Sequence, residues 1–265
     1  MNLAGKFVLV TGASSGIGRA LALELAGRGS RLVLTALEEA QLAGVAAEIE
    51  ARHGGHVEVR AADLSDVAGR DDLLAWLRSR ADPLDVVVSN AGGGRFARFT
   101  AAPWEDLRRT IALNVDAPTH LLRALLPLLL ARPEGRVALI SSGIARLPYP
   151  GLAAYGAAKG YLASLGESLA CELLGTRVRV MVFFPGFTRT GFMEAAGMDV
   201  SRVPGHMLGS PERVARQIAE GIAGGRRWRF SDLSARLGAV AAPLLPSALR
   251  VRILRNLFWR LPDED

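Results

Sequence analysis

The chain has 265 residues, half of them apolar, which allows one large α/β domain with an extensive core. Its net charge of +6 comes without any helix-turn-helix, zinc-finger or aromatic RNA-binding motif, so the sequence predicts no nucleic-acid partner. A single cysteine excludes an internal disulfide and a cysteine-based metal cluster, and four histidines without ligand spacing predict no metal site.

The amino-terminal segment MNLAGKF lacks the apolar stretch of a secretory signal, which favours a cytoplasmic protein. From residue 7 onward, short β-type runs alternate with longer helical patterns. Strands are predicted at 7–10, 31–35, 57–61, 85–89, 136–141 and 179–184. Helices are predicted at 17–28, 38–52, 66–80, 104–132 and 153–174, the last with a buried thiol at Cys171.

Alternating strands and helices predict an α/β fold, a doubly wound parallel sheet of the Rossmann type with helices on both faces. Most predicted strands are continuous apolar runs, as expected of strands covered on both sides, whereas residues 57–61 alternate and suit a place nearer the sheet edge. We expect a single domain at residues 1–225. Ligands in such folds bind beyond the carboxyl ends of the strands, so the residues that follow strands carry the functional information.

The segment TGASSGIG follows the first strand and opens the first helix. Its glycines, Gly12, Gly16 and Gly18, permit a tight turn, and a helix amino terminus offers free N–H groups and partial positive charge. This arrangement predicts a site for the diphosphate of a dinucleotide. The spacing is not that of a P-loop, which would need lysine at position 18.

Four further segments follow in order: SNAG at 89–92, LNV at 113–115, YGAAK at 155–159 and PGFTRT at 185–190, with a serine pair at 141–142. Together with TGASSGIG, this set resembles the short-chain dehydrogenase/reductase family, in which the same motifs occur in the same order. The similarity extends over about residues 5–225. It implies an NAD(P)H-dependent oxidoreductase that interconverts a ketone or aldehyde and an alcohol, and a homo-oligomer.

Tyr155 and Lys159 lie four residues apart and therefore share one helix face. A nearby ammonium favours tyrosinate, which would lower the pKa of Tyr155 and let it exchange a proton with a substrate oxygen. By resemblance, Ser142 holds the substrate oxygen and Asn114 holds a water that links Lys159 to solvent. The expected catalytic set is thus Asn114, Ser142, Tyr155 and Lys159.

The resemblance also implies the cofactor contacts. Asp63 would meet the adenine, the NAG segment would line the adenosine ribose, and Thr190 with the backbone near 187–188 would hold the nicotinamide carboxamide. The full expected cofactor-binding set is Gly12, Ser14, Ser15, Gly16, Ile17, Gly18, Asp63, Leu64, Asn90, Ala91, Gly92, Tyr155, Lys159, Pro185, Gly186, Thr188 and Thr190.

The choice between NAD and NADP depends on the end of the second strand. An acid there binds the ribose hydroxyls of NAD and repels a 2′-phosphate, but this chain has Ala36 at that position. It also lacks the basic residue that NADP-preferring members carry next, because Leu37 stands there. Ser14, Arg19 and Thr35 could still reach a phosphate. Absence of the repulsive acid favours NADP, with NAD as the alternative.

Apolar residues beyond the strands form the expected substrate pocket, which favours a hydrophobic carbonyl or alcohol. Its residues are Phe96, Ile144, Tyr149, Phe187 and Phe192, with Leu147, Met193 and Met198 as further candidates. Several of them could equally pack in the core.

Residues 226–265 carry a net charge of +4 and form a basic, amphipathic extension. On a helical wheel, Val251, Leu254, Leu257, Phe258 and Leu261 share one side, and Arg252, Arg255, Asn256 and Arg260 share the other. Such a helix, with Trp259, can lie on an anionic membrane surface or pack on protein. Two alternatives to a soluble carbonyl reductase stay open: a membrane-surface reductase of a long-chain 3-keto lipid, and a non-catalytic cofactor-binding scaffold or regulator.

Overall fold

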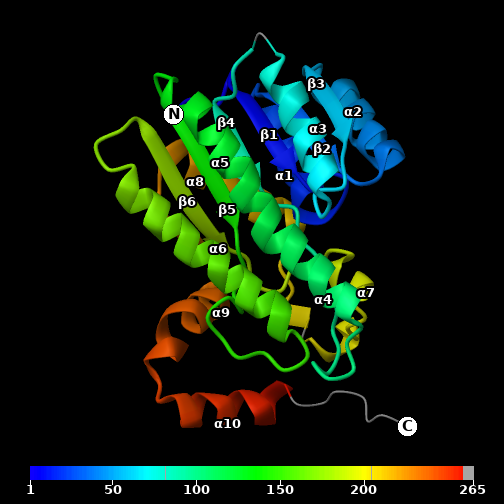
Figure 1. Ribbon diagram of the computed structural model, residues 1–265, viewed down its shortest axis with the longest axis vertical. Coiled ribbons are helices and arrows are strands. Elements are labelled where there is room, and N and C mark those ends of the chain that lie inside the picture. Colours follow the sequence, from blue (N-terminus) through cyan, green and yellow to red (C-terminus); the bar gives the residue numbers. More distant parts are fainter. Residues whose placement is uncertain (81, 204, 259–265) are drawn as a thin grey trace.

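A computed structural model describes residues 1–80, 82–203 and 205–258. Within them, seven parallel strands form one sheet in the order β3-β2-β1-β4-β5-β6-β7 (Figure 1). The order reverses between β1 and β4, so the predicted doubly wound sheet is confirmed, with β3 at one edge. The strands are β1 (Phe7–Thr11), β2 (Arg31–Ala36), β3 (Val57–Ala61), β4 (Val86–Ser89), β5 (Gly135–Ile140), β6 (Val178–Phe184) and β7 (Trp228–Phe230).

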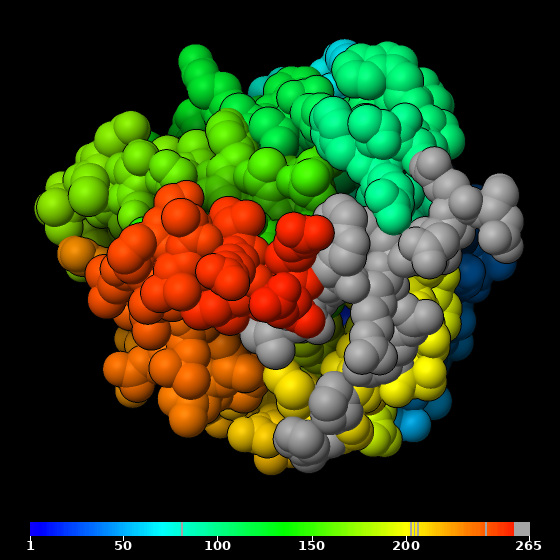
Figure 2. All heavy atoms as spheres, turned by 90° about the horizontal axis from the view of Figure 1, so that it is seen from below, coloured from blue at the N-terminus to red at the C-terminus, as the bar shows by residue number. Residues whose placement is uncertain are grey.

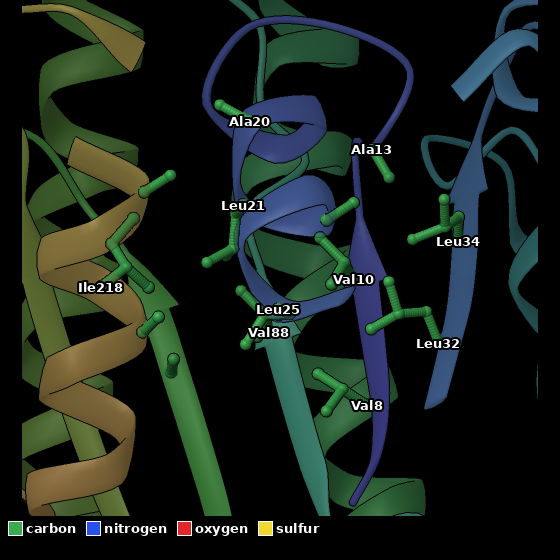
Figure 3. Close-up of a cluster of buried hydrophobic side chains, with 14 of the residues drawn as sticks. Val8, Val10, Ala13, Ala20, Leu21, Leu25, Leu32, Leu34, Val88 and Ile218 are labelled. Carbon is green, nitrogen blue, oxygen red and sulfur yellow. The ribbon is translucent and has the colours of Figure 1, made fainter. Parts of the chain in front are cut away.

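Helices cover both faces of the sheet because successive strand residues point to opposite sides. Val8 and Val10 pack in the cluster beneath α1 (Gly16–Gly27), α2 (Glu39–His53) and α8 (Pro211–Gly224), as Figure 3 shows for α1 and α8. Phe7 and Leu9 pack in the opposite cluster, beneath α3 (Val67–Arg78), α5 (Ala117–Leu130) and α6 (Ala153–Glu172). The core is therefore two apolar layers, one on each face of the sheet.

The helix predicted at 104–132 is interrupted. It consists of α4 (Trp104–Ile111), a π-helical turn η1 (Ala112–Asp116) and then α5. A π-helical turn inserts an extra residue into the hydrogen-bonding pattern and often occurs at functional sites. Here it carries Asn114, one of the expected catalytic residues.

The sheet continues past residue 225. Strand β7 lies in the segment that the sequence analysis assigns to the carboxy-terminal extension, and it pairs with β6 through Trp228, Arg229 and Phe230. Phe230 stacks on the buried Phe184, with ring centroids 5.0 Å apart. The strand has only three residues, too few for a visible alternation, which is why the pattern did not reveal it. After it come α9 (Leu233–Arg236), η4 (Leu237–Ala241), η5 (Ala242–Leu244) and α10 (Ser247–Phe258).

Some further features were not predicted. The segment between β6 and β7 holds α7 (Phe192–Ala195), η2 (Val200–Arg202), η3 (Gly205–Met207) and α8. Cys171 is exposed, so the prediction of a buried thiol was wrong: the cysteine lies near the end of α6, on its outer face. Across the described ranges, no helix is both long and apolar enough to cross a bilayer, and no three metal-ligating side chains gather.

Candidate active site

A cavity of about 760 Å³ lies beyond the carboxyl ends of the strands. Its walls come from the turn after β1, the segments after β2, β3, β4, β5 and β6, and helix α6. This volume is typical of a site that takes a small molecule. Every residue expected to bind the cofactor lines it: Gly12, Ser14, Ser15, Gly16, Ile17, Gly18, Asp63, Leu64, Asn90, Ala91, Gly92, Tyr155, Lys159, Pro185, Gly186, Thr188 and Thr190.

The turn between β1 and α1 requires its glycines. Gly12 and Gly16 have φ angles of +64° and +53°, a region that side chains disfavour. A β-carbon at Gly18 would lie 2.0 Å from the carbonyl oxygen of Gly12. No side chain caps the amino terminus of α1, and its first turn holds no acid. The turn therefore presents backbone N–H groups to the cavity and fits a diphosphate.

The segment after β4 holds this turn in place. The side-chain amide of Asn90 donates to the carbonyl oxygens of Thr11, at 2.9 Å, and Gly12, at 3.1 Å. The hydroxyl of Thr11 accepts in return from the backbone N–H of Asn90, at 3.0 Å, and of Ala91, at 2.9 Å. These bonds join β1 to β4, so Asn90 lines the cavity with its amide nitrogen already engaged in supporting the turn.

The expected catalytic side chains converge at the other end of the cavity. Lys159, buried on α6, donates from Nζ to the carbonyl oxygen of Ile140 at 3.0 Å and lies 5.6 Å from the ring centre of Tyr155. Ser141 donates from its hydroxyl to the carbonyl oxygen of Lys159 at 2.7 Å, which joins α6 to the end of β5. The next residue, Ser142, hydrogen-bonds Tyr155.

Burial decides the protonation of this pair. Desolvation raises the pKa of Tyr155 above its usual value, and the hydrogen bond with Ser142 opposes this only in part. Desolvation also lowers the pKa of Lys159 to about 8. From the sequence alone, we expect the ammonium of Lys159 to lower the pKa of Tyr155. In the free protein burial outweighs that attraction.

Asn114 lies just behind these residues and is fully buried. Its amide nitrogen donates to the carbonyl oxygens of Gly93 and Thr110, each at 2.8 Å, while its Oδ1 has no hydrogen-bond partner among the described residues. A β-carbon at Gly92 would lie 2.7 Å from this Oδ1 and 2.9 Å from Nζ of Lys159. Glycine at position 92 thus keeps clear the space that separates the two polar atoms.

The substrate end of the cavity is largely apolar. Ile144, Tyr149, Phe187 and Phe192 line it as expected, and the ring of Phe192 lies 5.0 Å from that of Tyr155. Phe96 does not line the cavity of the described structure, although its backbone N–H donates to the carbonyl oxygen of Ala196 at 2.7 Å and so joins two wall segments. Further apolar lining comes from Leu147, Leu152, Met193, Met198 and Met207.

At the adenosine end, Ala36 and Leu37 line the cavity and carry no charge. Asp63 pairs with Arg109 of α4, with 3.1 Å between carboxylate and guanidinium. Burial would raise the pKa of Asp63, but hydrogen bonds from Ser65 and the charge of Arg109 hold it below its usual value.

Two of the three residues expected to reach a phosphate do not face the cavity in this structure. Arg19 pairs with Glu48 of α2, and Thr35 is fully buried, whereas Ser14 lines the cavity.

Sequence reasoning missed several cavity residues. Arg109 lies on a helix without any local motif that marks it, and Ser234 and Ala235 of α9 come from the segment assigned to the extension. Their proximity to the site arises only from the fold.

The family model for short chain dehydrogenases matches residues 6–200. The chain belongs to this family. It is therefore an NAD(P)-dependent oxidoreductase of the short-chain type, and the expectation drawn from its motifs is confirmed. The match ends before β7 and α9, so both lie outside the part of the chain that the family model describes.

Three relatives illustrate the similarity. The 3-oxoacyl-acyl-carrier-protein reductase FabG of Escherichia coli is 31% identical over 227 residues, covering 83% of this chain and 90% of FabG. A short-chain dehydrogenase from Sphingobium yanoikuyae in complex with NADPH has a TM-score of 0.82 at 29% identity and covers 95% of both chains, hence part of the segment after residue 225. L-sorbose reductase from Gluconobacter frateurii, complexed with NADPH and L-sorbose, has a TM-score of 0.77 at 26% identity, covering 87% of this chain and 97% of its own.

Proposed function

We propose that this short-chain dehydrogenase is an NADPH-dependent reductase of hydrophobic ketones or aldehydes, with the corresponding alcohols as products. One observation carries the proposal. A single cavity joins the glycine turn to Ser142, Tyr155 and Lys159 and continues among apolar side chains. One continuous cavity can thus hold the cofactor and an apolar substrate next to the reacting groups.

Each residue at the reacting end has a definite task in this proposal. A bound nicotinamide supplies the hydride. Tyr155 gives a proton from its hydroxyl to the carbonyl oxygen, which Ser142 holds by a hydrogen bond. Lys159 as an ammonium favours the tyrosinate that results, and Asn114, through its unpartnered Oδ1, holds the water that returns a proton to Lys159.

The preference for NADPH rests on the adenosine end. A 2′-phosphate meets no carboxylate at Ala36 or Leu37, and the acid nearby, Asp63, is paired with Arg109. Ser14 lines the same cavity, and its hydroxyl can bind a phosphate. The named complexes of the Sphingobium and Gluconobacter enzymes contain NADPH, which supports the same choice.

Thermal shifts with NAD, NADH, NADP and NADPH test the cofactor, since a ligand of the native state raises Tm. We expect larger shifts with the two phosphorylated forms. Oxidation of NADPH is then followed at 340 nm with acetophenone, 2-octanone and ethyl acetoacetate, and with L-sorbose as a polar control. Turnover confined to the polar sugar, or clear preference for NADH, would contradict the proposal.

A second candidate, reduction of a long-chain 3-keto lipid at a membrane surface, is favoured by the face that carries α10. This helix lies beside η5 on the lower side of the molecule, the side that faces the viewer in Figure 2. Around it, Leu233, Leu237, Leu244, Leu249 and Ile253 are exposed, next to the exposed Arg252. Leu254 packs inward and Val251 is half exposed, so the helix turns a mixed face outward. The side chains of Leu257 and Phe258, with Trp259, Arg260 and Leu261, lie outside the described residues.

Co-sedimentation with phosphatidylglycerol vesicles tests this candidate on the full chain. We expect wild type to bind and the variant Leu244→Ser/Leu249→Ser to remain in the supernatant, because apolar burial drives interfacial binding. If neither protein sediments and wild type elutes as a dimer that the variant lacks, the face packs on a second copy instead.

A further inference from the structure

The turn of Pro185 and Gly186 is held by residues 45 positions further along the chain. The backbone N–H of Gly186 donates to the hydroxyl oxygen of Ser231 at 2.7 Å. The hydroxyl of Ser231 donates in turn to a carboxylate oxygen of Asp232 at 2.5 Å. Ser231 is itself buried and pairs through its backbone N–H with the carbonyl oxygen of Phe184 at 3.2 Å.

Asp232 fixes which group donates and which accepts in these two hydrogen bonds. Burial would raise the pKa of its carboxyl, but hydrogen bonds from Ser231, Ser234 and the backbone of Ala235 hold the pKa below its usual value. The ionised carboxylate only accepts, so the hydroxyl of Ser231 must donate to it. The lone pairs of that hydroxyl are then left for the N–H of Gly186. A β-carbon at Gly186 would lie 2.3 Å from the same carboxylate, so the contact is close as well as directional.

Asp232 also begins α9, which reaches the loop of Ser142. Its second carboxylate oxygen accepts from the backbone N–H of Ala235 at 2.9 Å, an N-terminal cap of the helix. A β-carbon at Gly143 would lie 3.3 Å from Ala235 and 3.3 Å from the carbonyl oxygen of Pro185. The N–H of Gly143 already donates to that oxygen at 2.8 Å. One short helix thus packs against both loops that flank the reacting end of the cavity.

We propose that Ser231 and Asp232 are a positioning pair that fixes the Pro185–Gly186 turn, and through it the nicotinamide half of the bound dinucleotide. The pair lies outside the family match, which ends at residue 200. It touches neither substrate nor the reacting atoms; it acts through the backbone of Gly186. This inference rests on the proposed use of a nicotinamide cofactor at the cavity.

The test compares two ligands by isothermal titration calorimetry: NADPH and 2′-phospho-ADP-ribose, which lacks the nicotinamide. Ser231→Ala removes the acceptor of the Gly186 N–H, and Asp232→Asn permits the serine hydroxyl to reverse. For both variants we expect NADPH affinity to fall about tenfold, while 2′-phospho-ADP-ribose changes by less than about twofold, since only the nicotinamide half contacts the turn.

Two further variants separate positioning from stability. Ser210→Ala removes the side-chain cap of α8, an exposed acceptor 3.2 Å from the N–H of Arg213, and touches no part of the turn. We expect it to lower Tm as the test variants do but to leave the affinities for both ligands unchanged. Ser231→Thr retains the hydroxyl and should restore most of the NADPH affinity.

The outcomes are distinct. Selective loss of NADPH affinity with rescue by threonine supports the positioning role. An equal loss of affinity for both ligands overturns it, because such a loss reports general damage to the protein. Unchanged affinity for both ligands also overturns it, because the contact then contributes nothing to binding. If wild type binds NADPH no more tightly than 2′-phospho-ADP-ribose, the nicotinamide adds no affinity and the pair has no such role, although the adenosine part of the site is supported. If wild type binds neither ligand, the proposed cofactor use itself fails.

Discussion

At the scale of single residues, the reacting end of the cavity is governed by desolvation. Tyr155 and Lys159 are neighbours on α6. Burial raises the pKa of Tyr155 and lowers the pKa of Lys159, so it favours the neutral form of both side chains. A neutral tyrosine is the proton donor that carbonyl reduction needs. The proposed reduction therefore starts from a neutral Tyr155, and the charge of Lys159 varies near pH 8.

Tyr155→Phe removes only the hydroxyl and keeps the ring that packs 5.0 Å from Phe192. We expect ketone reduction to fall by about a thousandfold, within the range lost with a general acid, while NADPH affinity stays within about twofold. Steady-state rates and calorimetry measure the two quantities. Unchanged turnover would remove Tyr155 from the mechanism, whereas NADPH binding without turnover in wild type would favour a cofactor-binding scaffold.

The pH dependence follows from Lys159, whose pKa lies at about 8. Below that pH the side chain is an ammonium, and above it the charge is lost. We therefore expect kcat/KM for reduction, which reports the free enzyme, to decline as pH rises through about 8. In Lys159→Met this step should disappear from a profile measured between about pH 6 and 10. A wild-type profile that is flat across pH 8 would contradict the assignment.

The sequence was sufficient to place Ser142, Tyr155 and Lys159 at one cavity, because Tyr155 and Lys159 share a helix face and the family resemblance adds Ser142. It could not predict Arg109 or Ser231, since nothing in their local sequence marks them. Their contacts, to Asp63 and to Gly186, join segments that meet only in the folded chain.

At the scale of elements, the glycine turn depends on close backbone approach. A β-carbon at Gly18 would meet the Gly12 carbonyl at 2.0 Å and the Asn90 amide at 2.6 Å, atoms that hold β1 to β4. Neither is the free end of a flexible chain, so the backbone itself would have to move.

Gly18→Ala is therefore expected to weaken NADPH binding by about a hundredfold or more and to lower Tm. Gly44→Ala is the matched control: it lies in α2, and its β-carbon would meet nothing within 4 Å. The control should raise the free energy of unfolding by about 0.5–1 kcal/mol, because alanine favours a helix over glycine. Calorimetry and thermal denaturation give both values. If the two variants behaved alike, the turn would not require its glycine.

Six strands were predictable because most are short continuous apolar runs, and the helices between them because their apolar residues recur at helix spacing. The π-helical turn at Asn114 was not, since one extra residue in a single turn leaves no mark in the helical pattern of residues 104–132. Strand β7 was not either, because its three residues are too few to show a period.

At the scale of the whole molecule, the carboxy-terminal segment packs against the rest of the domain through β7, α9 and η4. Phe184, fully buried, is covered by Trp228 and Phe230 at 5.0 Å each. Helix α10 contributes less, since its contacts are chiefly with η5. We therefore propose a domain boundary near residue 246 instead of residue 225.

Two truncations test that boundary. A chain that ends at Pro246 should keep NADPH binding and lose little Tm. A chain that ends at Gly225 exposes Phe184 and leaves the Gly186 N–H without its partner. We expect it to melt about 10 °C lower, since two covering aromatic side chains stabilise by about 1.5–3 kcal/mol each. Similar Tm values for the two truncated chains would place residues 226–246 outside the domain.

The contact between Gly186 and Ser231 has a consequence for the order in which the protein is made. By the time Lys159 has left the ribosome, every side chain of the expected catalytic set exists, and the glycine turn was synthesised long before. Residues 231–239, which secure the Pro185–Gly186 turn and back the loop of Ser142, emerge only after the whole expected catalytic set. The nascent chain can thus form most of its sheet first, and its dinucleotide site becomes complete only when residues 231–239 have followed.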